Sequence, residues 1–320
     1  MSGKDITEKT LEAYNDVFSD IVNVLIFDGK QVIKEDDLEQ ATPNSFYKAD
    51  KKLREQERDT SKYWKKQGIR IAYFGLENQS GQEDDVPLRV LGYDGASYRD
   101  QIFYEKGKDD KRVLNHNPRY PVITLVLYFG TSRWNKARTL YDSLDNVDER
   151  LSPYISDYKM NLFEIAWLTD EQVEMFQSDF RIVAEYCTQM RKNREYTPSY
   201  IKMKHVREVL HLMKVMTKDN RFEEVVAAME KGDEPQYMCE ALDIIENRGI
   251  QKGISQGISQ GISQGISQGI SQGLHMGEEK QARATAFRML SDDMPIETVA
   301  KYVDLDVDVI KKWWDGREDA

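Results

Sequence analysis

A four-residue repeat near the carboxyl end constrains this chain more than any other feature of its sequence. From residue 249 to residue 277 a glycine recurs at every fourth position, mostly within Gly-Ile-Ser-Gln. This period is close to the roughly 3.6 residues of a helical turn, so glycines and isoleucines would form two adjacent, slowly drifting stripes on a helix. Each glycine nevertheless costs roughly 1 kcal/mol relative to alanine in a helix interior. Residues 248–277 are therefore expected to be either a helix stabilised by self-association or a flexible linker.

The sequence before the repeat alternates between helices and buried strands. Apolar runs bounded by turn residues predict strands at residues 69–77, 122–129 and 160–168. Apolar residues at spacings of three and four, or charged stretches without alternation, predict helices at residues 8–27, 51–66, 87–104 and 170–247. Strands separated by helices indicate an α/β fold.

These elements divide the chain into an α/β core, a helical extension, the repeat and a small helical tail, at residues 8–170, 171–247, 248–277 and 278–320. The tail resembles a helix-turn-helix segment. Its second helix, however, begins with Asp306 and Asp308, which would face DNA phosphates unfavourably. A small structural bundle or an oligomerisation cap is the favoured interpretation of the tail.

The composition excludes several classes of protein. Hydrophobic residues make up 40% and charged residues 32% of the chain, which allows a core and suits an aqueous environment. The apolar run at residues 122–129 is too short to cross a membrane, and residues 1–20 lack the apolar centre of a signal peptide. We therefore expect a cytoplasmic protein that does not enter a membrane. The net charge of −11 is unlike that of a protein that coats nucleic acid, although residues 48–70 form a local basic stretch.

The end of the first predicted strand carries the main chemical signal. Glu77 and Gln79 are two residues apart, so in a strand they would point to the same face, whereas Asn78 would point away. Hydrolysis of a phosphodiester uses a divalent ion held by carboxylates, which activates water and stabilises the leaving oxygen. Mg²⁺ needs only one or two protein carboxylates besides water and phosphate oxygens. The spacing suits such a site, although Glu-x-Gln alone is common by chance.

The surroundings of this motif match the pattern of a known family, through Asp16-Val17-Phe18, Arg58-Asp59, Glu77-Asn78-Gln79-Ser80, Pro87-Leu88-Arg89 and Tyr93. In these residues the chain resembles the recombination-promoting nuclease family, also called YhgA-like putative transposases. The family belongs to the PD-(D/E)XK nuclease superfamily. The resemblance therefore implies an α/β, restriction-endonuclease-like core, here followed by a helical C-terminal half and a glycine-repeat tail.

The resemblance also implies a set of catalytic residues. Asp59 and Glu77 would bind Mg²⁺, or Ca²⁺ or Mn²⁺ in its place, and the carbonyl of Asn78 would add a ligand. Gln79 stands where the superfamily usually has a lysine. A glutamine cannot supply a positive charge, but its amide can orient the attacking water.

The identity of the first acid stays open at this point. Asp59 falls within the helix predicted over residues 51–66, whereas the superfamily places this acid on a strand. Asp50 or Glu55 could be the ligand instead.

Two further residues would assist the site. Asp16, from the first helix, would hold an outer water molecule, unless it is simply a solvated helix residue. Arg89 would contact a phosphate of the substrate, unless it is instead a buried partner of Glu77 that fixes the junction between strand and helix.

Together these features predict a metal-dependent DNA endonuclease of low sequence specificity. The family name associates such breaks with recombination, and mobile elements or phage defence are fitting contexts. The alternative is a non-catalytic DNA-binding or oligomeric regulator on a degenerate nuclease fold. The expected partners are DNA and further copies of the chain. Self-association through residues 249–277 would give both the glycine and the isoleucine stripe a role.

Overall fold

The computed structural model describes residues 10–41, 44–49, 52–57, 59–106, 112–114, 118–229 and 234–316. The chain divides into two compact units, Met1–Glu246 and Asn247–Ala320. Asp50 and Arg58 lie outside the described residues, and in the strands at 44–49 and 52–57 only the backbone is described. In this part of the chain, no helix has both the length and the apolar composition needed to cross a membrane.

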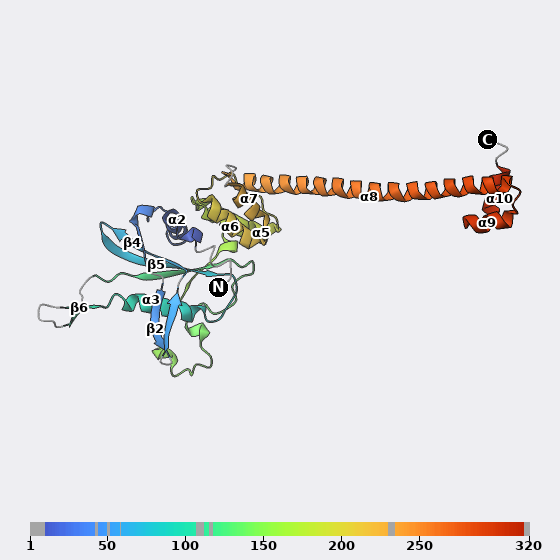
Figure 1. Ribbon diagram of the computed structural model, residues 1–320. Helices are drawn as coiled ribbons and strands as arrows, with labels where there is room; N and C mark the ends of the chain where they lie inside the picture. Colours follow the sequence, from blue (N-terminus) through green and yellow to red (C-terminus); the bar gives the residue numbers. More distant parts are fainter. Residues whose placement is uncertain are drawn as a thin grey trace. The chain divides into compact units, whose positions relative to one another are not determined.

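A five-stranded mixed sheet lies at the centre of the first unit (Figure 1). Its strands, in spatial order, are β1 (Leu38–Gln40), β4 (Thr60–Lys66), β5 (Ile69–Gln79), β8 (Val122–Tyr128) and β9 (Asn161–Glu164). β4 is antiparallel to both of its neighbours, β1 and β5, whereas β5, β8 and β9 are parallel. Two hairpins lie outside this sheet, formed by β2 (Asn44–Ala49) with β3 (Lys52–Glu57) and by β6 (Tyr104–Lys106) with β7 (Arg112–Leu114).

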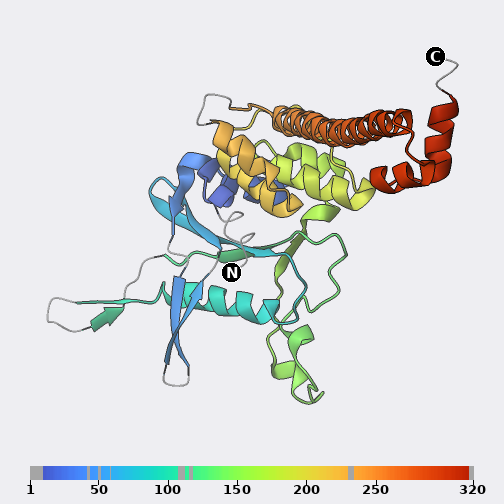
Figure 2. The same ribbon diagram turned by 45° about the vertical axis from the view of Figure 1, so that its right-hand side comes forward.

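Helices cover both faces of the sheet (Figures 1 and 2). One face carries α2 (Asn15–Phe27), α5 (Phe180–Asn193), α6 (Val206–Thr217) and α7 (Arg221–Met229). The other face carries α3 (Val86–Arg99), and the short helix α4 (Asp170–Met175) precedes α5. Because both faces are covered, β5 is buried on each side from Ala72 to Gln79 and shows no alternation of apolar and polar residues.

The two strands at the middle of the sheet show which side chains share a face. Phe74 and Leu76 of β5 belong to the large core that also contains α2 and α5. Glu77 pairs in register with Val126 of β8, and Val126 packs against α3. Neighbouring residues of paired strands point to the same side, so Glu77 and Gln79 face α3, whereas Asn78 faces α2.

The helix predicted over residues 51–66 is wrong. The described residues of this range include β3 and β4, and β4 is hydrogen-bonded to β1 on one side and to β5 on the other. The sequence of β4 is charged and polar, but pairing on two sides satisfies its backbone, and Thr60, Ser61 and Lys62 are buried. Tertiary pairing therefore overrides the local preference that favoured a helix.

Other predicted elements are confirmed with shifted ends. The first helix is interrupted: residues 10–12 are helical, a turn follows, and α2 begins at Asn15. It ends as expected at Asp28 and Gly29, which have φ angles of 52° and 78°. α3 ends at Arg99, five residues before the predicted end at 104. The predicted strand at 160–168 is only β9, followed by a 3-10 turn at Ile165–Trp167.

The repeat is helical. It lies within α8 (Met238–Ser291), a continuous helix of 54 residues, so the structure has a helix here and not a flexible segment. Every residue from 249 to 281 is exposed. Beyond the repeat, α9 (Ile296–Val303) and α10 (Val307–Asp315) pack with the end of α8 around Ala286, Val299 and Ile310, as expected for a small helical bundle.

Candidate functional site

The carboxyl end of β5 places three polar residues inside the protein. Glu77, Asn78 and Gln79 are 5%, 8% and 6% exposed. The Gln79 amide donates a hydrogen bond from Nε2 to Glu77 Oε1 at 3.3 Å, so the two side chains are in contact on one face. Buried polar groups are costly unless they are engaged, and such a cluster at a strand end is typical of a functional site.

Asp59 joins this cluster from the neighbouring strand. It directly precedes β4, and its Oδ2 accepts a hydrogen bond from the backbone N–H of Asn78 at 2.6 Å. The structure thus brings together Asp59 and the Glu-x-Gln motif, and it places Asp59 at the start of a strand rather than in a helix. The side chains of the alternatives, Asp50 and Glu55, fall outside the description.

Arg89 approaches Glu77 from α3. Its Nη1 is 3.9 Å from Glu77 Oε1, and its Nη2 is 3.2 Å from Glu83 Oε2. Arg89 therefore occupies the place that the alternative interpretation gave it, as a cation beside Glu77 at the junction between strand and helix. The Arg89 side chain is 33% exposed, although its Nε and Nη2 atoms are buried.

Sequence reasoning missed Glu12. This residue is 2% exposed, and its Oε2 accepts a hydrogen bond from Asn78 Nδ2 at 2.9 Å. The residue lies in the short helical turn before α2, which was predicted as part of one continuous helix. The interruption after residue 12 lets Glu12 turn towards β5, and no local pattern in the sequence signals it.

A buried lysine holds that turn in place. Lys62 of β4 donates from Nζ to the carbonyl oxygen of Ala13 and to Asn15 Oδ1, both at 2.5 Å. Burial lowers the pKa of Lys62 to about 8, because the charged ammonium is poorly solvated there. Lys62 thus connects the sheet to the segment that carries Glu12.

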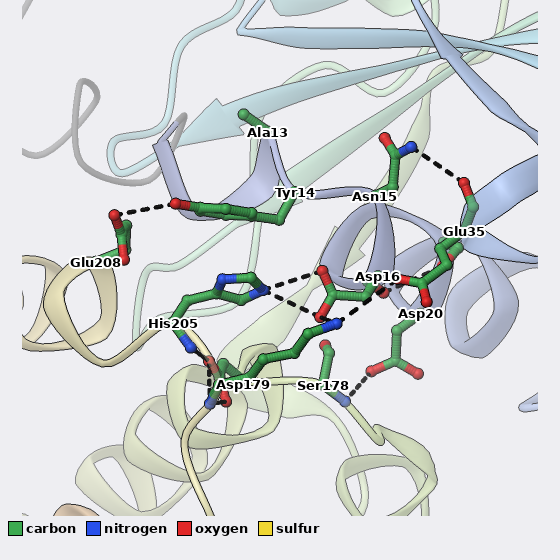
Figure 3. A network of polar contacts seen from close by, with 12 residues as sticks. Ala13, Tyr14, Asn15, Asp16, Asp20, Glu35, Ser178, Asp179, His205 and Glu208 are labelled. Atoms are coloured by element: carbon green, nitrogen blue, oxygen red, sulfur yellow. Dashed lines mark hydrogen bonds and ion pairs between the residues drawn. The ribbon is translucent and has the colours of Figure 1, made fainter. Parts of the chain in front are cut away.

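Asp16 lies in a second polar network, between α2 and the segment that precedes α6 (Figure 3). Both of its carboxylate oxygens are 3.0 Å from His205 Nε2, and Oδ2 is 3.1 Å from Lys204 Nζ. Burial acts to raise the pKa of Asp16, but hydrogen bonds from Lys204 and His205 outweigh it and hold the pKa below its ordinary value. The Tyr14 ring stacks on His205, with centroids 3.7 Å apart. Asp16 therefore links two helical segments, and its predicted role in holding a water stays a prediction.

The carboxylate oxygens near the carboxyl end of β5 are ligands that a hard divalent ion prefers. No group of three or more His, Cys, Asp or Glu residues is arranged to hold a metal within the part of the chain that is described. Mg²⁺, however, keeps several waters and needs only one or two protein carboxylates when phosphate oxygens complete its shell. Asp59 and Glu77 supply that number of carboxylates from adjacent strands, so these residues fit the ion.

The described features define an α/β protein whose mixed sheet ends in a buried Glu-x-Gln motif with an acid from the adjacent strand. The sequence profile of the family described as "Putative transposase, YhgA-like" matches residues 22–224, and the chain belongs to this family. The membership confirms the resemblance and indicates a transposase- or nuclease-related role. Searches among curated proteins and among solved structures found no match. Glu12 and Asp16 precede the matched segment.

Proposed function

We propose that this protein is a divalent-metal-dependent DNA endonuclease of low sequence specificity, built on a PD-(D/E)XK core, whose breaks promote recombination. The observation that carries the proposal is the hydrogen bond from the backbone of Asn78 to Asp59. It brings an acid at the start of β4 beside Glu77 and Gln79 at the end of β5. The helices on both faces of a sheet with antiparallel and parallel parts also support such a core.

Asp59 and Glu77 would hold the metal, Mg²⁺ or alternatively Ca²⁺ or Mn²⁺, with the carbonyl of Asn78 as a further ligand. When bound, the ion would supply an activated water and stabilise the leaving oxygen. Gln79 would orient the attacking water through its amide, which the contact with Glu77 already fixes in direction. Because Gln79 is neutral, the site needs a cation from elsewhere to face the charge that develops on the phosphate.

Arg89 is the cation best placed for that role. It is bonded loosely to Glu77, at 3.9 Å, and more closely to the exposed Glu83. A phosphate at the edge of the sheet would compete with these two carboxylates for the guanidinium, and binding of a metal by Glu77 would favour the exchange. Arginine is suited to it because its planar group binds phosphate through two parallel hydrogen bonds.

The direct test is cleavage of supercoiled plasmid by the purified protein. We expect relaxed or linear product with Mg²⁺, Mn²⁺ or Ca²⁺, and none after addition of EDTA. The opposite result, folded protein that cleaves nothing with any of these ions, would favour the non-catalytic regulator. The ion pair between Arg89 and Glu77 is the observation that supports this second candidate, since it already neutralises the acid without a metal.

We also propose that the protein forms a homo-oligomer, partly through residues 249–277. The isoleucines of the repeat are 53–59% exposed in the single chain, and a Cβ placed on any of its glycines would meet nothing within 4 Å apart from the adjacent residues and backbone of its own helix. A second helix could approach the glycine stripe closely and cover the isoleucine stripe at the same contact. Two nuclease sites in one assembly would suit cutting of both DNA strands.

A further inference from the structure

A cavity opens beside the same edge of the sheet, on the face that α5 and α6 cover. The backbone N–H of Phe129, directly after β8, donates to the carbonyl of Gln79 at 2.9 Å, so the ends of β5 and β8 are joined there. Phe129 and Thr131 line a cavity of about 510 Å³. This volume falls within the roughly 300–1,000 Å³ of sites that hold small ligands or parts of larger ones.

The walls of the cavity are in part apolar and aromatic. Besides Phe129, they include Tyr186 and Met190 of α5 and Val215 and Met216 of α6. Flat aromatic rings and the polarisable sulfur of methionine favour contact with another planar, polarisable group. A nucleobase is such a group, and stacking of bases on aromatic side chains depends little on the base.

Three basic side chains also line the cavity. Arg191 and Arg194 come from the end of α5, and Lys218 follows α6. Arg191 is held in position, because its Nε donates to the carbonyl of Ala166 at 2.6 Å and its guanidinium stacks 4.2 Å from the centroid of the Trp167 ring. An arginine fixed in this way loses little conformational freedom when it binds a ligand.

Two acids near these cations are engaged with other basic side chains. Asp219, next to Lys218, is bonded to Arg221 at 2.7 Å, and Asp170 is paired with Lys192. Across the described ranges, no salt bridge involves Arg194 or Lys218. In a protein with a net charge of −11, a cavity lined by these three cations is suited to an anion.

The C-terminal ends of α5 and α6 carry partial negative charge, which reduces the positive charge of the three basic side chains but does not cancel it. Each helix ends beside the cavity, at Asn193 and Thr217, and a helix C-terminus carries the equivalent of about −0.5 charge. Two such ends amount to about −1, against three positive side chains. The cavity therefore remains electropositive next to an apolar wall.

We propose that this cavity binds one nucleotide of the substrate strand, with its base against the apolar wall and its phosphate on Arg191, Arg194 and Lys218. The inference rests on the proposed nuclease function. Glu77 and Gln79 face α3, whereas the cavity lies on the face of α5 and α6. The nucleotide in the cavity is thus a neighbour of the cleaved bond, and the strand passes around the edge of the sheet between the two places.

The test is the affinity of the full-length protein for a short, fluorescently labelled single-stranded oligonucleotide, measured by anisotropy with Mg²⁺ in the Glu77→Gln background. The double variant Arg194→Ala/Lys218→Ala should bind on the order of 10-fold or more weakly. Its affinity should also depend less steeply on salt, because each cation that no longer meets a phosphate lowers the slope by about 1. Restoring charge with Arg194→Lys/Lys218→Arg should recover most of the affinity.

Two further variants distinguish binding of the oligonucleotide in the cavity from its nonspecific binding to basic residues on the surface. The matched control Arg99→Ala/Arg150→Ala removes two exposed cations elsewhere on the same unit and should bind as the parent does. Thr131→Trp fills the cavity from its rim without changing charge, and should weaken binding while leaving the salt slope unchanged. Equal affinities for the parent, the Arg194/Lys218 variant and the control would overturn the inference, as would unchanged binding by Thr131→Trp.

Cleavage by the chain with Glu77 intact keeps the two proposals distinguishable. Normal cleavage of plasmid together with unaltered binding by the cavity variants leaves the nuclease and removes the nucleotide site. Binding that depends on Arg194 and Lys218 in a protein that cleaves nothing leaves the nucleotide site and removes the nuclease. Absence of both binding and cleavage overturns both.

Discussion

The carboxyl end of β5 and the repeat of α8 differ in which residues they bury: β5 buries polar side chains there, whereas α8 exposes apolar ones. Glu77, Asn78 and Gln79 are polar and almost fully buried, and their partners, such as Asp59 and Glu12, come from distant parts of the chain. The isoleucines of the repeat are apolar and more than half exposed. Burying the first set and exposing the second both cost free energy, so each arrangement implies a partner.

The difference lies in where that partner is found. At the carboxyl end of β5, the hydrogen bonds of the buried groups are within the chain, and the partners in the proposed function are a metal and a phosphate. In α8, eight glycines weaken the helix by roughly 1 kcal/mol each relative to alanine, and every residue of the repeat is exposed along its described length. We therefore expect substitutions at the carboxyl end of β5 to change the cleavage activity, and substitutions in the repeat to change the oligomeric state.

The largest effect is expected at Glu77. Replacement by glutamine keeps the size of the side chain but removes the charge that would hold the metal, so cleavage of plasmid should fall by orders of magnitude. Circular dichroism and molecular mass should stay unchanged. The matched control is Glu83→Gln, which alters the other, exposed partner of Arg89 and should retain most of the activity. Comparable rates for the two variants would contradict a metal ligand at Glu77.

A second contrast concerns stability. Phe18 of α2 is fully buried in the core, so Phe18→Ala should lower the free energy of unfolding of the first unit by about 3–5 kcal/mol. Ile258→Ala, at a position that is 58% exposed, should leave that unit within about 0.5 kcal/mol of the parent. Urea unfolding followed by fluorescence measures both. A large decrease in the free energy of unfolding from Ile258→Ala would mean that the repeat stabilises the first unit, which would contradict the proposed difference between the two regions.

A smaller effect with a diagnostic sign is expected from the glycines. Changing Gly257, Gly261, Gly265 and Gly269 to alanine should stabilise a lone helix by about 1 kcal/mol each. In a closely packed pair of helices, the added Cβ atoms would instead prevent contact. We expect higher helix content and a lower mass by light scattering. The control changes the four serines two residues later in each repeat to alanine, and an equal mass for both variants would exclude the glycine contact.

The smallest effect concerns pH. Burial lowers the pKa of Lys62 from 10.5 to about 8, so between these values the unfolded chain binds a proton that the folded chain does not. Stability should therefore rise with pH from about 8 to 10.5, and Lys62→Met should flatten this rise. Urea midpoints across this range measure it, and parallel curves for the two proteins would contradict the burial of the charge. The repeat has no ionisable side chain between Lys252 and His275, so its helix signal should not change.

Much of the candidate site could be predicted from the sequence, because its central part is local. β5, β8 and α3 each carry a continuous apolar pattern or a proline at their start, and these elements are confirmed close to their predicted places. The Glu-x-Gln motif lies on β5, so the common face of Glu77 and Gln79 followed from strand geometry. The sequence of β4 favours a helix, because its lysines and polar residues give no sign of the two strands that pair with it.

The sequence by itself determined the elements that local periodicity controls: the strand predicted at residues 69–77, the end of the amphipathic helix before Asp28 and the helical period of the repeat. Only the tertiary structure decided that Asp59 precedes a strand and meets Asn78, and that Glu12 reaches the same residue from the first helical turn. The physical reason is the range of the interactions. Backbone preferences and apolar spacing act over a few residues, whereas hydrogen bonds between buried groups join residues that only folding of the whole sheet brings together.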